Sequence, residues 1–261
     1  MKEIISRVWR AIIEFDLIEA NDRILIGLSG GKDSLFLTHV LAQIRRHSAR
    51  PFSLGAFTID TRFGEIFPRQ ELQTFCDQLD IPFDSTVVDI PRAISTAKVP
   101  DPCATCAFFR RGALNRIANE RGYNKVALAH HHDDAVETFM MGLFYAGRLK
   151  TFLPKTPQER SGLTIIRPLV YFREQEIIEN ANKLGLQPLK NPCPYNGNTK
   201  RQEIKEMLSS FEAKDPEYYR RFSAAMRGGE TAELWPAEPD RYALKGRYLD
   251  FRGYARTNNE N

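Results

Sequence analysis

Residues 23–34 read RILIGLSGGKDS, in which a short apolar run ends in a glycine-rich turn. The apolar part, 23–28, has the length and composition of a buried strand. Apolar residues then recur at helical spacing, at Leu37, Val40, Leu41 and Ile44. A strand, a glycine turn and a helix in succession expose backbone N–H groups at the positive end of a helix dipole. The stretch therefore predicts an anion-binding turn.

The same alternation of strand and helix patterns continues along the chain. Apolar runs predict further strands at 52–59, 85–88, 125–128 and 163–167, and apolar periodicity predicts helices around 72–79, 103–121, 134–145 and 173–184. Connections of this length favour a parallel sheet with helices on both faces. We therefore expect an α/β fold with a doubly wound parallel sheet, and a loop at 150–162.

Changes in the pattern divide the chain into three expected parts. An amphipathic repeat at Ile5, Val8, Trp9 and Ile12 predicts an N-terminal helix within 1–22. The sheet domain is expected over 23–185. The remainder, 186–261, is expected to be a C-terminal extension of helices and loops that becomes irregular from about 232.

Composition limits the class of protein before any motif is considered. The 261 residues are 42% hydrophobic and 27% charged, with 37 Lys plus Arg against 33 Asp plus Glu. These values exclude disordered, collagen-like and disulfide-rich secreted chains. No apolar run approaches the ~20 residues of a membrane helix, and the first fifteen residues mix charges among apolar positions, unlike a signal peptide. We expect a cytoplasmic protein with no membrane partner, in which cysteines are not disulfides.

The turn that follows the first strand carries side chains suited to a nucleotide phosphate. Gly30 and Gly31 let the backbone approach an anion closely. Lys32 adds positive charge, Asp33 is a candidate ligand for Mg²⁺, and hydroxyl groups come from Ser29 and Ser34. The pattern is neither GxxxxGK[ST] nor GxGxxG. Ordinary ATPases and dehydrogenases are therefore poor candidates.

Three of the four cysteines are candidate metal ligands. Cys103 and Cys106 form a CxxC pattern at the start of a predicted helix, where Asp101 is expected to be the N-cap. Cys193 lies in the turn-rich stretch NPCPYNG, where core packing does not explain it. Cys76 lies on an apolar helical stripe and is predicted to be a core residue. The spacing alone leaves zinc, a redox pair and an iron–sulfur cluster open.

Helical geometry gives an expected direction for the CxxC side chains. On a regular helix Cys103, Cys106 and Arg110 share a side with the apolar positions Leu114 and Ile117. We therefore expect the two thiols and the guanidinium to point toward the protein. An arginine in such a position usually meets an anion.

Taken together, the motifs resemble a known family. The SGGKDS turn, the CxxC pattern followed by Arg110 and Arg111, the stretch HHHDD at 130–134, and Cys193 followed by Arg201 resemble the PP-loop ATP pyrophosphatase superfamily. They are most similar to its TtcA branch, the tRNA 2-thiocytidine synthetases. The Cys193-Pro194-Tyr195 step is also similar to the TtuA branch, which thiolates a uridine. The resemblance covers roughly residues 20–225.

This resemblance implies an ATP-dependent sulfurtransferase that adenylates the C2 oxygen of a tRNA pyrimidine, cytidine above all, and replaces it with sulfur. ATP and Mg²⁺ would be bound by Leu28 and residues 29–34, with Lys32 and Asp33 catalytic, and by Ile59, Asp60, Arg110, Arg111 and His130. Asp134 would act as an acid/base or metal-positioning residue, with Asp133 or Asp134 also capping a helix. For His131 and His132, a mere packing or surface position explains the residue as well as a functional role does.

The same resemblance implies that Cys103, Cys106 and Cys193 hold a [4Fe-4S] cluster. It also implies tRNA as a partner, a sulfur donor such as a cysteine desulfurase, sulfide or a carrier protein, and allows a homodimer. Two alternatives stay open: the same chemistry on a uridine or a small molecule, and a non-enzymatic nucleotide-binding module with structural zinc.

The chain departs from the family pattern at two positions. Lys190 stands where TtcA-like proteins usually have a second cysteine, and Ala129 replaces the usual glycine before the histidines. Basic clusters that could contact RNA occur around 45–50, 148–155, 200–201, 220–221 and 241–256. In the stretch YYRRF at 218–222 the basic residues alternate with aromatic ones, which suits phosphate contact and stacking.

Overall fold

The computed structural model describes residues 2–64, 67–96, 101–190, 192–195, 199–215, 217–227, 240–243 and 245–246. The chain divides into two compact units, 1–226 and 227–261. The predicted irregular region from about 232 lies largely outside the described residues, although 241–243 and 245–246 are helical. The domain boundaries expected at 22/23 and 185/186 stay predictions.

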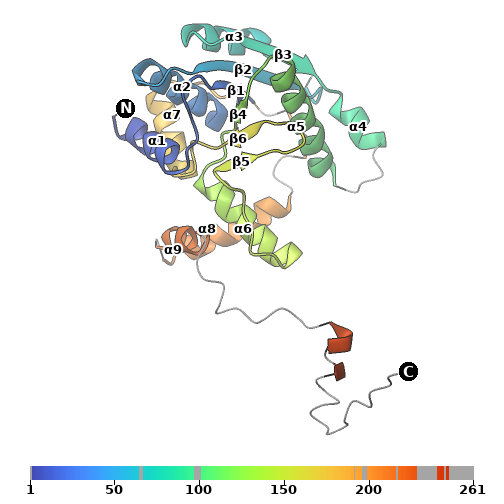
Figure 1. Ribbon diagram of the computed structural model, residues 1–261. Coiled ribbons are helices and arrows are strands. Elements are labelled where there is room, and N and C mark those ends of the chain that lie inside the picture. Colours follow the sequence, from blue (N-terminus) through green and yellow to red (C-terminus); the bar gives the residue numbers. More distant parts are fainter. Residues whose placement is uncertain are drawn as a thin grey trace, which may run out of the picture. The chain divides into compact units, whose positions relative to one another are not determined.

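A six-stranded sheet forms the centre of the first unit, and its strand order is β3-β2-β1-β4-β6-β5 (Figure 1). The strands are β1 (Arg23–Gly27), β2 (Ser53–Asp60), β3 (Phe83–Val87), β4 (Lys125–Ala127), β5 (Lys155–Pro157) and β6 (Thr164–Ile166). All pairings are parallel except that of β5 with β6. The chain winds outward from β1 to β3 and then returns to β4 on the other side. The carboxyl ends of β1 and β4 therefore flank the switch point where such sheets bind ligands.

The doubly wound parallel sheet expected from the sequence is confirmed, but the loop expected at 150–162 is wrong in part. Residues 155–157 form β5, which pairs antiparallel with β6 through Thr156 and Ile165. This edge strand has only three residues and ends in Pro157. Three residues are too few for an alternation of apolar and polar side chains to be recognised, so the sequence did not predict the strand. The short helix α4 (Ile90–Thr96) was also not expected.

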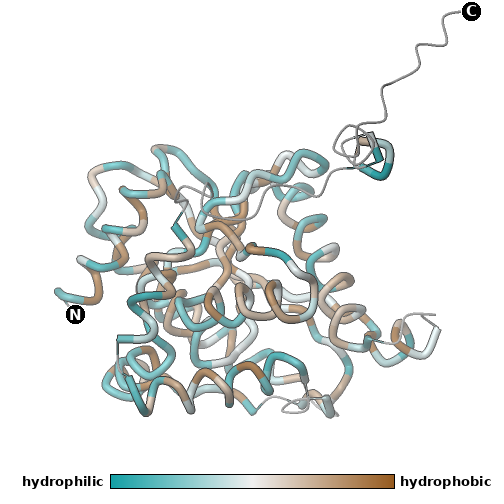
Figure 2. Tube along the Cα trace, turned by 90° about the horizontal axis from the view of Figure 1, so that it is seen from below, coloured by the Kyte–Doolittle hydropathy of each residue, from teal (hydrophilic) through white to brown (hydrophobic). Residues whose placement is uncertain are grey.

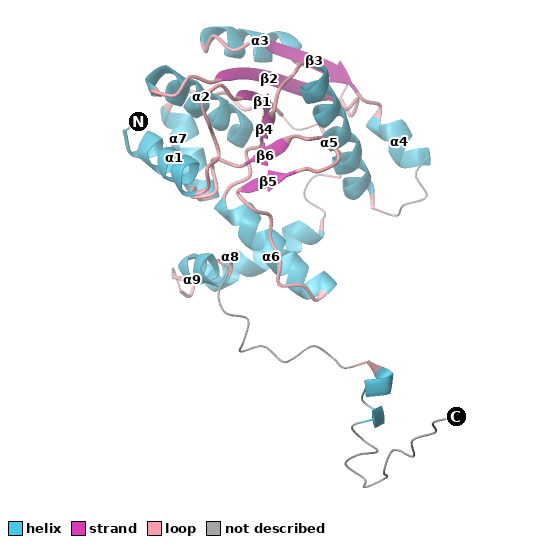
Figure 3. Cartoon of the chain, in the orientation of Figure 1, coloured by secondary structure: helices cyan, strands magenta, loops and turns pink. Residues whose placement is uncertain are grey.

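Helices cover both faces of the sheet (Figures 1 and 3). One apolar cluster joins the sheet to α1 (Lys2–Glu14), α2 (Lys32–His47), α3 (Arg69–Gln78) and α7 (Glu174–Lys183). A second cluster joins the opposite face to α5 (Pro102–Glu120). A third packs α6 (His132–Ala146) against α8 (Lys200–Glu212) and α9 (Tyr218–Ala225). Figure 2 shows the apolar segments gathered in the middle of this unit, with hydrophilic segments around them.

The alternation of side chains along β1 explains why both faces are covered. Ile24 and Ile26 belong to the first cluster, whereas Leu25 belongs to the second. Cys76 is fully buried in the first cluster, and burial raises the pKa of its thiol to about 12. The prediction that Cys76 is a core residue is therefore confirmed. In the described residues, the helices are too short or too polar to cross a membrane.

A buried ion pair ties the beginning of β4 to the segment before β1. Lys125 and Asp22 are both 4% exposed, and Lys125 Nζ lies 2.7 Å from an Asp22 carboxylate oxygen. Lys125 also donates to the Leu17 carbonyl at 3.1 Å. A buried charge that loses its partner is strongly destabilising.

We expect Lys125→Met to lower the free energy of unfolding by about 3–5 kcal/mol, because Asp22 would be left buried without its cation. Adding Asp22→Asn should restore much of this loss. Urea unfolding measures both, with Lys183→Met on the exposed side of α7 as the control. Equal stabilities of Lys125→Met and the control would contradict the ion pair's role.

Candidate active site

The glycine turn that follows β1 is closed by a later segment of the chain. Gly30 has a φ of 81°, and a Cβ placed on it would lie 2.7 Å from Leu189 Cδ1. The amide of Leu189 donates to the Gly30 carbonyl at 2.9 Å. Ser34 Oγ accepts a hydrogen bond from the Ser29 amide at 3.1 Å and donates one to the Gly31 carbonyl at 2.9 Å. The left-handed backbone therefore favours glycine at position 30, and a side chain there would also displace Leu189.

Lys32, the first residue of α2, is held by two carboxylates. Its Nζ lies 3.1 Å from Asp33 Oδ2 and 3.0 Å from Glu174 Oε1, and Glu174 also binds Lys205. Burial alone would lower the pKa of Lys32, but Asp33 and Glu174 raise it above its ordinary value. The lysine is therefore a fixed positive charge. Glu174 begins α7, and no motif in the sequence pointed to it.

A cavity of about 650 Å³ lies beside the turn, at the carboxyl ends of β1 and β2. Ser29 and Gly31 line it from the turn, and Ile59 and Asp60 line it from β2. Leu28 differs from the other predicted binding residues, because its side chain is buried in the core. Its carbonyl accepts a hydrogen bond from the Thr58 hydroxyl, which fixes the turn to β2.

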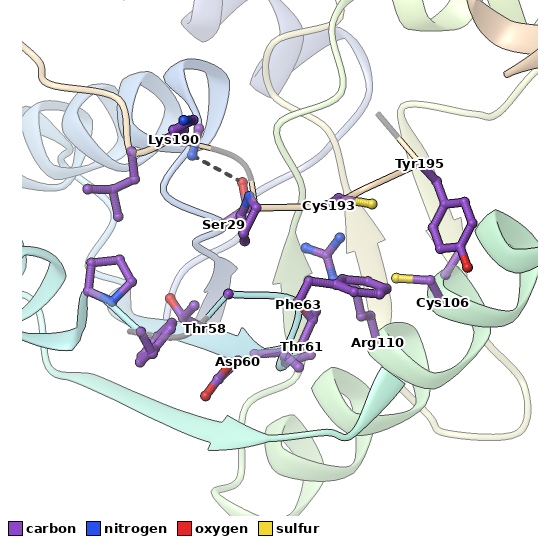
Figure 4. A pocket seen from close by; sticks show the side chains of 18 of the residues that line it. Ser29, Thr58, Asp60, Thr61, Phe63, Cys106, Arg110, Lys190, Cys193 and Tyr195 are labelled. Carbon is purple, nitrogen blue, oxygen red and sulfur yellow. Dashed lines mark hydrogen bonds between the residues drawn. The ribbon is translucent and has the colours of Figure 1, made fainter. Parts of the chain in front are cut away.

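The same cavity receives the three predicted cysteine ligands. Cys103 and Cys106 lie near the start of α5, which Asp101 caps by accepting a hydrogen bond from the Ala104 amide at 3.0 Å. Cys193 reaches the cavity from the segment that precedes α8. In Figure 4 the sulfur atoms of Cys106 and Cys193 face the same space, with the guanidinium group of Arg110 beside it. Burial raises the pKa of both α5 thiols.

The expectation that Cys103, Cys106 and Arg110 point into the protein is wrong in one respect. Cys103 and Arg110 are exposed and Cys106 is half-buried. The apolar side of α5 packs on the sheet only from Leu114 onward. Nearer its beginning, the same side of the helix faces the cavity.

His131 brings together the carboxylates of two different loops. Its side chain is buried, with Nε2 3.4 Å from Asp134 and 4.0 Å from Asp33, and Nδ1 3.5 Å from Asp133. Burial alone would lower the pKa of His131, but these carboxylates raise it above its ordinary value. The sequence had left this histidine undecided between a functional role and a mere packing or surface position.

The two neighbouring aspartates have different partners. Asp134 accepts the His131 amide at 2.9 Å, near the start of α6, and an Arg201 nitrogen at 2.9 Å. Asp133 accepts the Glu174 amide at 2.8 Å and Arg173 Nε at 3.0 Å, so it caps α7. Burial opposes ionisation of Asp133, yet its hydrogen bond with His131 and the charge of Arg173 keep its pKa below the ordinary range. Of these two aspartates, Asp134 lines a second, smaller cavity, whereas Asp133 caps α7.

Two other predicted residues lie apart from the glycine turn. His130 packs its ring 5.2 Å from that of Phe152, and burial lowers its pKa to about 4. Arg111 donates to the Ala107 carbonyl of its own helix. His130 is therefore neutral, and neither residue lines the cavity beside the turn.

Glu137 is a carboxyl group that the sequence analysis missed. It is 4% exposed and lines a second cavity of about 300 Å³ together with Asp33, Asp134 and Cys193. Burial raises its pKa to about 7, and the nearby Asp134 acts in the same direction. Its position three residues after Asp134 on one helix face is the signal that could have identified it.

We expect the stability of the protein to fall by about 2–3 kcal/mol as the pH rises from 4.5 to 7, through Glu137 alone. The reason is that the folded protein keeps this proton up to about pH 7, whereas the unfolded chain releases it near its ordinary pKa. Glu137→Gln should lack this fall. Urea unfolding of both proteins at several pH values measures the difference, with the exposed Glu179→Gln as control. Parallel curves for wild type and Glu137→Gln would refute it.

The comparisons with known proteins agree with this geometry. A model of the PP-loop domain family matches residues 2–210. Similar proteins include a tRNA-cytidine(32) 2-sulfurtransferase of Nitrosomonas eutropha, 34% identical over 92% of this chain and 76% of that protein. Another, of Geobacter metallireducens, is 33% identical over 92% of this chain and 95% of that protein.

Among solved structures, the U34-tRNA thiolase NcsA from Methanococcus maripaludis with its [4Fe-4S] cluster is similar, with a TM-score of 0.70 and 25% identity. The match covers 95% of this chain and 87% of that one. The doubly wound parallel sheet and the glycine turn after β1 together define a PP-loop protein. The chain belongs to this family and, within it, to the tRNA-cytidine(32) 2-sulfurtransferases.

Proposed function

We propose that the protein is an ATP-dependent tRNA sulfurtransferase, which adenylates the C2 oxygen of a cytidine and replaces that oxygen with sulfur. One observation carries the proposal. The larger cavity, beside the glycine turn, and the smaller one, beside Asp33 and Asp134, share Cys103, Cys193 and Tyr195. The glycine turn, the carboxylates and the thiols therefore line two adjacent cavities that share part of their walls.

The turn suits the first half of this reaction, in which the C2 oxygen attacks the α-phosphorus of ATP and pyrophosphate leaves. The amides at the start of α2 and the charge of Lys32 would neutralise the leaving group. Asp33 Oδ1 is buried and makes no hydrogen bond to the described residues. Such an oxygen suits Mg²⁺, which keeps several waters and is bound by one or two carboxylates plus substrate phosphates.

Charged groups that line the smaller cavity suit the handling of protons. Asp134 is oriented by Arg201, and Glu137 lies 3.4 Å from the same guanidinium group. A carboxyl group with a pKa of about 7 can give up or accept a proton at physiological pH. Asp134 is our proposed acid/base residue, and Arg110 is proposed to bind a developing negative charge.

The donor set fits an iron–sulfur cluster, whose usual protein ligands are cysteine thiolates. Cys103, Cys106 and Cys193 line the wall of a common cavity. Three thiolates would leave one iron of a [4Fe-4S] cluster without a protein ligand. When bound, such a cluster would supply the sulfur that replaces the C2 oxygen.

Cytidine is the proposed target because the similar curated proteins at 33–36% identity are named for it. The solved neighbour named for U34 is 25% identical, so a uridine is the second candidate. A small-molecule substrate would leave tRNA nucleosides unchanged, and a zinc-binding module would release no pyrophosphate. The proposal includes a cytoplasmic location and a sulfur donor; a cysteine desulfurase, sulfide or a carrier protein would each serve. The homodimer stays a prediction.

We expect Lys32→Ala to reduce tRNA thiolation at least about a hundredfold, because the leaving pyrophosphate loses its fixed cation. The reconstituted protein is incubated anaerobically with ATP, Mg²⁺, sulfide and tRNA. Mass spectrometry of the nucleosides identifies the thiolated base, and chromatography measures AMP. Lys183→Ala is the matched control. Wild-type thiolation by Lys32→Ala would exclude the adenylation step.

We expect Cys103→Ser, Cys106→Ser and Cys193→Ser each to lose most of the iron after anaerobic reconstitution, because each removes one of three thiolate ligands. Cys76→Ala should keep its iron, since Cys76 lies in the core. Iron content and EPR spectra report the result. A colourless wild-type protein that binds zinc would instead favour the non-enzymatic alternative.

A further inference from the structure

The end of α6 and the loop that follows it form a surface that the proposed site does not use. We call residues 143–153 the exposed ridge. Every residue from 143 to 150 is exposed, and the ridge's large apolar side chains, Leu143, Phe144, Tyr145, Leu149 and Leu153, are 41–61% exposed. Arg148 and Lys150 lie between them in the sequence. Contiguous apolar exposure of this kind marks an interaction site.

The ridge has a fixed backbone. Gly147 ends α6 with a φ of 59°, and the Arg148 amide donates to the Gly142 carbonyl at 2.9 Å. A Cβ on Gly142 would lie 2.9 Å from the Arg148 carbonyl oxygen and 3.0 Å from that of Lys150. Thr151 Oγ1 donates to the Ala135 carbonyl at 2.7 Å. The loop therefore lies tightly against α6, and the side chains of 148–150 remain in solvent.

Charge indicates the kind of partner. From 138 to 158 the sequence contains Arg148, Lys150 and Lys155 but no Asp or Glu, although the chain as a whole is nearly balanced. Lys200 Nζ lies 4.9 Å from the centre of the Tyr145 ring. The carboxylate of Glu203 meets the ridge at one point, where it accepts a hydrogen bond from the Tyr145 hydroxyl at 2.9 Å. Cations alternating with exposed aromatic rings are the surface that RNA-binding proteins use for phosphates and bases.

The ridge also packs against His130, which lies just before α6. The Phe152 ring lies 5.2 Å from that of His130 and 4.8 Å from the guanidinium carbon of Arg167. Arg167 donates to the Leu153 carbonyl at 2.6 Å. The helix that begins at the site ends at the ridge, and its 15 residues span roughly 20 Å. A large substrate whose reacting base enters the cavity would extend over this surface.

We propose that the exposed ridge binds the RNA substrate outside the reacting nucleotide, with Arg148 and Lys150 on phosphates and Phe144 stacking on a base. This inference rests on the proposed function, because it takes the RNA substrate from there. It assigns RNA binding to one surface among several basic clusters of the chain.

The test compares two double variants of the full-length, reconstituted protein. Arg148→Ala/Lys150→Ala should weaken tRNA binding about tenfold to a hundredfold. It should also reduce the slope of log affinity against log salt by about 2, because two phosphate contacts are lost. The control, Lys183→Ala/Lys214→Ala, removes the same charge from exposed positions at the end of α7 and just after α8, outside the basic clusters named above. Filter binding at several salt concentrations measures affinity and slope.

A second variant tests stacking without changing charge. Phe144→Ser should weaken tRNA binding about tenfold, with an unchanged salt slope. If wild type thiolates tRNA but both ridge variants bind it like the control, the ridge is not an RNA contact and the proposed function stands. If wild type neither binds nor thiolates tRNA, the proposed function fails and the ridge proposal with it. If Leu149→Asp/Leu153→Asp converts a dimer to a monomer in sedimentation while tRNA affinity is unchanged, the ridge contacts a second copy instead.

Discussion

The site depends on the meeting of three carboxylates around one buried histidine. His131 lies between Asp33, from the turn after β1, and Asp133 and Asp134, from the start of α6. The two loops would otherwise repel each other, because each carries negative charge toward the switch point of the sheet. A histidine whose pKa is raised offsets that repulsion in a place that water hardly enters.

The two aspartates beside His131 also fix the positions of more distant residues. Asp133 fixes the first turn of α7, which positions Glu174 against Lys32. Asp134 fixes Arg201 at the beginning of α8. Lys32, the acid/base candidate Asp134 and helix α8 are thus oriented by contacts that start from His131 and its aspartates. Charged groups held in this way need little rearrangement when a nucleotide adds its own charge.

Much of the fold could be predicted from the sequence, because long apolar repeats and glycine turns are local signals. The turn at 29–34 and the core position of Cys76 are of this kind. The strand β5 and the role of Glu174 could not be predicted, because each depends on a partner distant in sequence. The direction of Cys103 was misjudged for a related reason: helical periodicity gives a side of the helix, but not where the sheet beneath it ends. Glu137 could have been predicted as a site residue from the sequence, because it follows Asp134 by about one helical turn on the same helix.

The closure of the glycine turn by Leu189 has a consequence for the distance between two parts of the site. Gly30 accepts a hydrogen bond from Leu189, only four residues before Cys193. Because a chain extends at most ~3.6 Å per residue, four residues span at most roughly 14 Å. The covalent chain itself therefore keeps Cys193 near the glycine turn.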